Sequence, residues 1–174
     1  MILNLLHDRH SLTEVACIKR AIEDSYGLYG VQVHDRGYFY VPFKGPRLDA
    51  SELLRYMAGV LGTEMCLWVV DEELFYPGKG AIFGCSAGEA AVLSRSGMDQ
   101  VVLAKEAIHE VGHVLGLNHC QENCVMNLSK SREEVGKKSS SLCSSCSTRL
   151  LIRAAADSEF SRQPTVTTLL WPRI

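Results

Sequence analysis

The sequence predicts an α/β fold, of the α+β sandwich kind, with helices packed on a mixed, twisted β-sheet. Strand patterns and helix patterns alternate along the first two thirds of the chain, as expected when helices cover a sheet. The chain has 174 residues, which is long enough to bury a core without disulfide bonds. Its composition, 47% hydrophobic and 22% charged, is that of an ordinary globular protein. No repeat or linker interrupts this pattern. We therefore predict a single domain over residues 1–174, with a sheet-bearing part at 1–116 and a C-terminal part at 117–174.

The N-terminal elements follow from short local patterns. Residues 2–6 (ILNLL) are an apolar run that predicts a buried strand. The S-x-x-E pattern of residues 11–14 predicts a capping box, which opens a helix that ends near Gly27. The alternation and β-rich residues of 31–41 predict two strands, and the turn residues 35–37 (DRG) join them in a hairpin.

The middle of the chain predicts further alternation of helix and strand. Residues 49–52 predict the start of a second helix with one apolar face, and Gly62 predicts its end. Residues 65–70 predict a strongly buried strand, and residues 80–94 predict two short strands around a glycine-rich turn. Residues 96–116 predict a helix with Ser96 or Asp99 as its N-cap.

Residues 109–124 (HEVGHVLGLNHCQENC) concentrate residue types that bind metals. In a helix, His109 and His113 lie one turn apart on the same face. Two imidazoles at this spacing can reach one zinc ion from a rigid support. Glu110 lies one position further round the helix, where it can hold a metal-bound water and take its proton without being a ligand.

His119 is a third candidate ligand, provided that the helix ends before it. In a continuous helix, His119 would lie about 15 Å further along the axis than His109, beyond reach of the same ion. Gly116 offers a place to end the helix, because glycine enters a left-handed C-cap conformation at little cost. Three protein ligands leave one position open for water or substrate, which indicates a catalytic zinc site.

The cysteines predict a second site. C-x3-C followed by C-x2-C is typical of a metal site in a chain without a signal peptide, since four thiolates favour tetrahedral zinc. Such a site has no open position and is structural. Four reduced buried cysteines are an alternative; a redox C-x-x-C lacks the surrounding βαβ unit. The four ligands predicted are Cys120, Cys124, Cys143 and Cys146. The other three cysteines, expected in the core, are Cys17, Cys66 and Cys85.

These residues together resemble a known family. HEVGHVLGLNH matches the metzincin signature HExxHxxGxxH, and the cysteines after it resemble those of the archaemetzincin branch of zinc metallopeptidases. The resemblance implies a compact metzincin (zincin-like) domain with an active-site helix and a second zinc that staples a C-terminal helical part. It also implies that Met126 forms an apolar floor under the three histidines. One departure is that three residues separate Cys120 from Cys124, where the family commonly has four.

The resemblance bears on substrate binding as well. In metzincins, the strand that edges the cleft lies shortly before the zinc helix and pairs with the substrate backbone. Residues 80–94 resemble that strand in order and position, although a routine core hairpin is equally consistent with their pattern.

The function expected is that of a zinc-dependent metallopeptidase with two zinc ions and Glu110 as general base. One alternative is a peptide-binding zinc scaffold with weak or no activity, for which Glu110 has no chemical purpose. Another is a zinc module that docks nucleic acid, but no basic stripe surrounds the cysteines, although Lys137 and Lys138 lie close by. Residues 129–141, rich in Ser, Lys and Glu, predict a solvated loop rather than a site.

Charge and hydropathy limit the partners and the cellular location that we expect. A formal net charge of −2 gives no electrostatic case for nucleic acid or an anionic membrane as partner. No apolar run has membrane-spanning length, and the first ten residues lack the pattern of a signal peptide. We expect a cytoplasmic monomer that acts on a peptide or protein substrate. Cys143 and Cys146 should open a last helix, and Trp171 and Pro172 should pack back on the domain.

Overall fold

The computed structural model describes the backbone of residues 1–160 and the side chains as far as residue 156. The main sheet has the strand order β2-β1-β4-β8-β7, and a small sheet has the order β3-β5-β6. The first four strands of the main sheet run parallel, and β7 pairs antiparallel with β8. The strands are β1 (Ile2–His7), β2 (Gln32–Tyr38), β3 (Arg47–Asp49), β4 (Cys66–Val70), β5 (Glu73–Tyr76), β6 (Gly80–Ile82), β7 (Gly84–Ala87) and β8 (Ala90–Ser94). The mixed sheet predicted from the sequence is confirmed.

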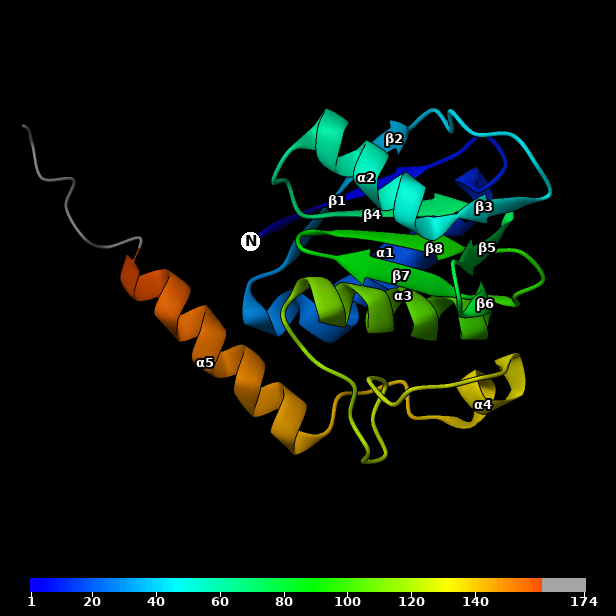
Figure 1. Ribbon diagram of the computed structural model, residues 1–174. Coiled ribbons are helices and arrows are strands. Elements are labelled where there is room, and N and C mark those ends of the chain that lie inside the picture. The colour runs from blue at the N-terminus through cyan, green and yellow to red at the C-terminus, as the bar shows by residue number, and fades with distance from the viewer. Residues whose placement is uncertain (161–174) are drawn as a thin grey trace, which may run out of the picture.

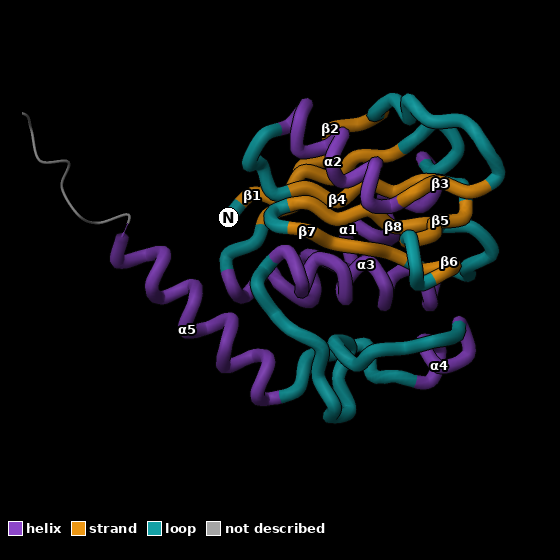
Figure 2. The backbone as a smooth tube through the Cα atoms, in the orientation of Figure 1, coloured by secondary structure: helices purple, strands orange, loops and turns teal. Residues whose placement is uncertain are grey.

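Helices lie on both faces of the main sheet (Figure 1). The α-helices are α1 (Val15–Tyr26), α2 (Ala50–Leu61), α3 (Gln100–Val114), α4 (Arg132–Lys137) and α5 (Ser144–Phe160). Helix α2 covers one face, while α1 and α3 lie together on the other (Figure 2). Helix α5 extends away from the sheet, and a long connection that contains α4 passes below α3 (Figure 1). In the described part of the chain, no helix has both the length and the apolar character needed to span a membrane.

Two hydrophobic cores result from the alternation of side chains along the central strands. Leu5 of β1 and Leu67 of β4 point to the core under α1 and α3. Their neighbours Leu6 and Trp68 point to the core under α2. Because helices cover both faces, these strands are apolar at successive positions, which is the pattern typical of buried parallel strands.

The helix starts chosen from the sequence are confirmed for α2 and α3. The Asp49 carboxylate accepts hydrogen bonds from the backbone N–H groups of Ser51 at 2.8 Å and Glu52 at 3.4 Å. Of the two N-caps considered for α3, Asp99 is the one observed, and its carboxylate accepts from the Val102 amide at 2.8 Å.

The capping box predicted for residues 11–14 is wrong. Ser11 precedes a short 3-10 helix, Leu12–Glu14, and its side chain makes no capping hydrogen bond. The Glu14 carboxylate instead pairs with Arg95 at 3.3 Å, since the two side chains meet after folding. The backbone amide of Ser11 is satisfied by Asp8 at 2.9 Å, so the local pattern is replaced by long-range and turn contacts.

The hairpin predicted around residues 35–37 is also wrong, because β2 passes through this segment without reversing. The Asp35 carboxylate accepts from the Gly37 amide at 2.9 Å, and Gly37 has a φ of 79°. These features make a bulge instead of a turn, where the register with β1 shifts between Leu5 and Leu6. Turn residues therefore mark an irregularity inside a strand.

The solvated loop predicted at residues 129–141 contains structure. It includes α4, whose Val135 is fully buried, and the Lys138 side chain is only 6% exposed. The final helix α5 begins between the two cysteines expected to open it, whereas the placement predicted for Trp171 and Pro172 lies outside the described residues.

A close contact joins α3 to the segment after it. A Cβ atom at Gly112 would lie 2.3 Å from the sulfur of Met126 and 2.8 Å from the Tyr26 hydroxyl. Both of these side chains are fully buried, and the Tyr26 hydroxyl donates to the Ile108 carbonyl at 2.7 Å. Glycine is therefore required at position 112 by space.

We expect Gly112→Ala to lower the free energy of unfolding by about 1–3 kcal/mol, because the added methyl group overpacks this contact. The matched control is Gly59→Ala on the exposed side of α2, where, apart from its chain neighbours and the helix's own backbone, no atom of the described chain lies within 4 Å of the added Cβ. Removing a helical glycine there should raise stability by up to about 1 kcal/mol. Urea unfolding measures both variants. Equal effects of the same sign at the two positions would contradict the packing argument.

Candidate metal centre and active site

Helix α3 ends where the third histidine requires it to end. Gly116 adopts a φ of 82°, and its amide bonds to the His113 carbonyl at 2.9 Å. The Leu117 amide then reaches back to the Gly112 carbonyl at 2.8 Å, which closes the helix in the manner of a glycine C-cap. The chain reverses after Gly116 and brings His119 beside the helix, as predicted.

The three histidines converge through their Nε2 atoms. His113 Nε2 lies 3.1 Å from His109 Nε2 and 3.3 Å from His119 Nε2. Two nitrogens bound to one tetrahedral zinc at about 2.0–2.1 Å lie about 3.3 Å apart, so the spacing matches a shared ion. The structure thus brings together all three histidines singled out in the sequence.

Backbone carbonyls orient two of these imidazoles. His109 Nδ1 lies 2.9 Å from the Val125 carbonyl, and His113 Nδ1 lies 2.7 Å from the Leu117 carbonyl. With Nδ1–H donating to a carbonyl, the lone pair of Nε2 is left free for a metal. Burial lowers the pKa of His109 to about 3 and also lowers the pKa values of His113 and His119. All three are therefore neutral near pH 7, the state in which histidine binds metal.

Glu110 lies beside the histidines in a tight, buried position. Burial, with a smaller contribution from Glu106, raises the pKa of Glu110 to about 8. A Cβ atom at Gly84 on β7 would lie 2.7 Å from Glu110 Oε1, so only glycine leaves room for this carboxylate. Its other oxygen, Oε2, is buried without a hydrogen-bond partner in the described structure. A carboxylate oxygen left free beside three converging nitrogens fits a site that holds a metal ion and a water molecule.

These residues lie in a cleft of about 760 Å³ between β6–β7 and the chain that follows α3. Strand β7 is the edge of the main sheet, so one side of it has no partner strand among residues 1–160. The chain after α3 contributes residues 116–119 and 128–130, and Tyr76 and Lys79 complete the lining. The sequence predicts two strands in residues 80–94, whereas the structure has three. Strand β7 was missed because it lies in the part that reads as a glycine-rich turn.

The four cysteines expected to bind metal also come together. Their sulfur atoms all lie within 4.8 Å of one another, and Cys120 Sγ lies 3.7 Å from Cys143 Sγ. This distance is too long for a disulfide bond and is close to the separation of about 3.8 Å between two thiolates on tetrahedral zinc. Burial raises the pKa of Cys146, whereas a backbone hydrogen bond at Cys146 lowers the pKa of Cys143. Four thiolates this close together would repel one another without a cation between them. The donor set fits a closed zinc site.

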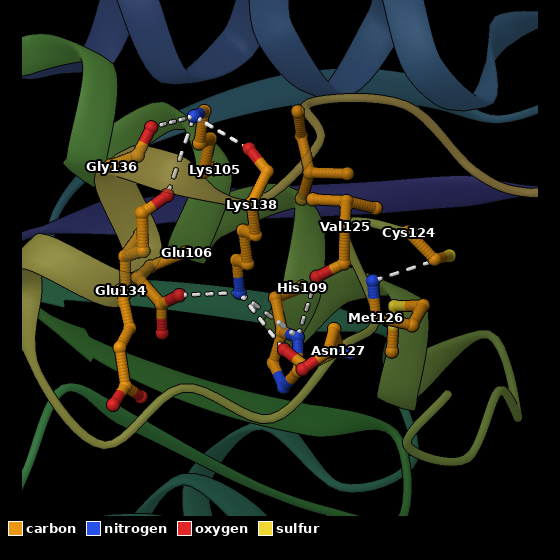
Figure 3. A network of polar contacts seen from close by, with 12 residues as sticks. Lys105, Glu106, His109, Cys124, Val125, Met126, Asn127, Glu134, Gly136 and Lys138 are labelled. Carbon is orange, nitrogen blue, oxygen red and sulfur yellow. Dashed lines mark hydrogen bonds and ion pairs between the residues drawn. The ribbon is translucent and has the colours of Figure 1, made fainter. Parts of the chain in front are cut away.

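Of the remaining cysteines, Cys66 is buried as expected, whereas Cys17 and Cys85 are half-buried. Two charged residues near the site were not predicted. Glu106 and Lys138 form a buried ion pair beside His109 (Figure 3). Glu106 lies three residues before His109, a spacing that places both on one helix face. Lys138 carries no such local signal.

Comparisons with known proteins agree with this geometry. Residues 67–152 match the model of peptidase family M54. The archaemetzincin of Aeropyrum pernix is 40% identical over 95 residues, which cover 49% of this chain and 52% of that protein. The archaemetzincin of Natronomonas pharaonis is 32% identical over 121 residues, which cover 59% of this chain and 70% of that protein. The chain thus spans about half the length of the first of these relatives.

Solved structures give fuller coverage. The crystal structure of the archaemetzincin of Methanopyrus kandleri superimposes with a TM-score of 0.74 at 30% identity, covering 90% of this chain and 96% of that chain. The archaemetzincin of Archaeoglobus fulgidus, complexed with malonate, gives a TM-score of 0.74 at 26% identity, covering 86% and 99%. The fold, the sequence matches and the motif-bearing residues agree, and this chain belongs to the archaemetzincin family, peptidase family M54.

Proposed function

We propose that this chain is a zinc-dependent metallopeptidase. His109, His113 and His119 would hold a catalytic zinc, and the four cysteines would hold a structural zinc. The observation that supports this most strongly is the convergence of three Nε2 atoms beside the unpartnered oxygen of Glu110. An interaction module would have no need for a buried carboxylate with one oxygen left free, because burying it costs free energy without a binding partner.

When bound, the catalytic zinc supplies Lewis acidity, which polarises a peptide carbonyl and acidifies a water molecule. Glu110 would accept the proton of the attacking water at Oε2 and pass it to the leaving amine. Because Gly84 has no side chain, the Glu110 carboxylate can lie close to β7. Burial raises the pKa of Glu110 to about 8 when no cation lies beside it. A divalent cation would favour the charged carboxylate, which is the form that acts as a base.

The substrate would bind as an extended peptide. The edge of β7 that pairs with no strand in the described part of the chain lines the cleft, and its backbone groups could pair with an added strand. This position favours the substrate-binding interpretation of residues 80–94 over a routine core hairpin. We further propose, as the sequence predicts, a single-domain protein that acts on peptides or proteins as a cytoplasmic monomer and does not bind nucleic acid.

Glu110→Gln should reduce peptide hydrolysis by at least about a hundredfold, because an amide cannot take a proton from water. Both metal ions should remain bound, since Glu110 is not a ligand in this proposal. A peptide library digested by the purified protein and read by mass spectrometry measures the activity. Glu23→Gln, on the exposed side of α1, is the matched control and should cleave like the parent. Hydrolysis by Glu110→Gln at the parental rate would show that another group acts as base.

Protein purified without added metal should contain two zinc ions per chain, because two complete ligand sets are present. Mild chelation should remove about one of them, since the three-histidine site has an open position and the four-cysteine site has none. Elemental analysis before and after chelation counts the ions. One ion or none in the untreated protein would contradict the two-site assignment.

A further inference from the structure

The ion pair between Lys138 and Glu106 is buried beside the candidate catalytic site. Lys138 Nζ lies 2.8 Å from Glu106 Oε1, and both side chains are only 6% exposed. Taking two charges out of water costs several kcal/mol per ion, and a buried pair is often no more stabilising than apolar residues of the same size. Fold stability alone therefore does not explain why charges occupy this place.

Lys105, the residue before Glu106 in α3, holds the backbone at Lys138. Lys105 Nζ donates to the carbonyls of Gly136 at 2.6 Å and Lys138 at 2.8 Å, and it lies 3.3 Å from the Val135 carbonyl. These carbonyls lie at the C-terminal end of α4, where a cation is favoured. Two consecutive residues of α3 therefore fix Lys138: Lys105 binds the backbone carbonyl of Lys138, and Glu106 binds the ammonium of Lys138 (Figure 3).

The Lys138 ammonium also reaches the segment after Met126. It lies 3.3 Å from the Asn127 carbonyl and 3.5 Å from His109 Nδ1. The His109 Nδ1 already bonds to the Val125 carbonyl, and with a metal on Nε2 it is a donor that cannot accept from an ammonium. The Asn127 carbonyl is therefore the acceptor that Lys138 serves, and Lys138 connects Glu106 to this backbone.

Residues 125–127 carry groups that the candidate site needs. The Val125 carbonyl orients His109, and the buried Met126 packs against Gly112 of the same helix. The Met126 carbonyl accepts from the Cys120 amide at 2.9 Å. A donor that holds the Asn127 carbonyl against α3 thus limits the movement of the carbonyl on which the orientation of His109 depends.

We propose that Lys138 is a positioning residue for the catalytic zinc. Its ammonium, anchored by Glu106, holds residues 125–127 against α3 and thereby fixes the imidazole of His109. This inference rests on the proposed function, because it requires His109 to be a zinc ligand. Supports of this kind commonly change metal affinity by roughly ten- to a hundredfold when they are removed.

The test compares the zinc affinity of the histidine site in four full-length proteins by competition with a chelator. Lys138→Met removes the ammonium and keeps the length of the side chain. Lys138→Met combined with Glu106→Met removes both charges, so no unpaired charge is left buried. Lys137→Met is the matched control, since Lys137 is 73% exposed and pairs with Glu133 on the surface. Unfolding in urea gives the stability of each protein.

We expect both Lys138 variants to bind zinc at the histidines about ten- to a hundredfold more weakly than the parent. The double variant should regain stability relative to Lys138→Met but not zinc affinity, because the Asn127 carbonyl still lacks its donor. Hydrogen exchange at the Cys120 and Asn127 amides should be faster in both variants, and Lys137→Met should match the parent.

Two outcomes overturn the inference. If the double variant binds zinc with parental affinity, the pair only balances charge and Lys138 positions nothing. If the parent itself binds no zinc at the histidines, the proposed function fails and this inference fails with it. Measuring the parent first keeps the two failures distinct.

Discussion

The chain reversal at Gly116 is the constraint on which both candidate metal sites depend. The backbone there has a φ of 82°, and within residues 1–160 only glycines adopt positive φ. A Cβ atom at this position would lie 2.6 Å from the Arg153 guanidinium, a flexible group that can move aside, so the backbone conformation is what requires glycine. Beyond the reversal, His119 faces the histidines of α3, and the next residue, Cys120, turns toward the other cysteines. One turn therefore supplies a ligand to each candidate site.

The polar face of α3 explains how a buried helix carries this chemistry. Lys105, Glu106, His109 and Glu110 are all less than a tenth exposed, which is unusual for ionisable residues unless they are paired. Lys105 is paired with carbonyls and Glu106 with Lys138, so neither leaves an uncompensated charge. Glu110 differs, because one of its oxygens is buried without a partner in the described structure. The unsatisfied group is the one to which the proposed chemistry assigns a proton.

How much could be predicted from the sequence depends on the range of the interactions involved. The histidines and Glu110 belong to one helix and its C-cap, so spacing alone placed them correctly relative to one another. The pairing of Lys138 with Glu106 joins residues 32 positions apart and has no local signature. The turn-like residues 35–37 were misread because the same residue types form a bulge inside a strand as readily as a hairpin turn. Local patterns thus identified the candidate ligands, and long-range contacts determine what supports them.

The segment 125–127 is held from two directions, and this affects how the two sites influence each other. On one side, the Cys120 amide bonds to the Met126 carbonyl and Cys120 forms a β-bridge with Asn127, so the cysteine cluster adjoins this backbone. On the other side, Lys138 reaches the Asn127 carbonyl from α3. Supports that share one backbone segment are not energetically independent, because loosening one changes what the other must hold. The arrangement of His109 is therefore a property of the whole region between α3 and the cysteines, and the HExxH helix accounts for only part of it.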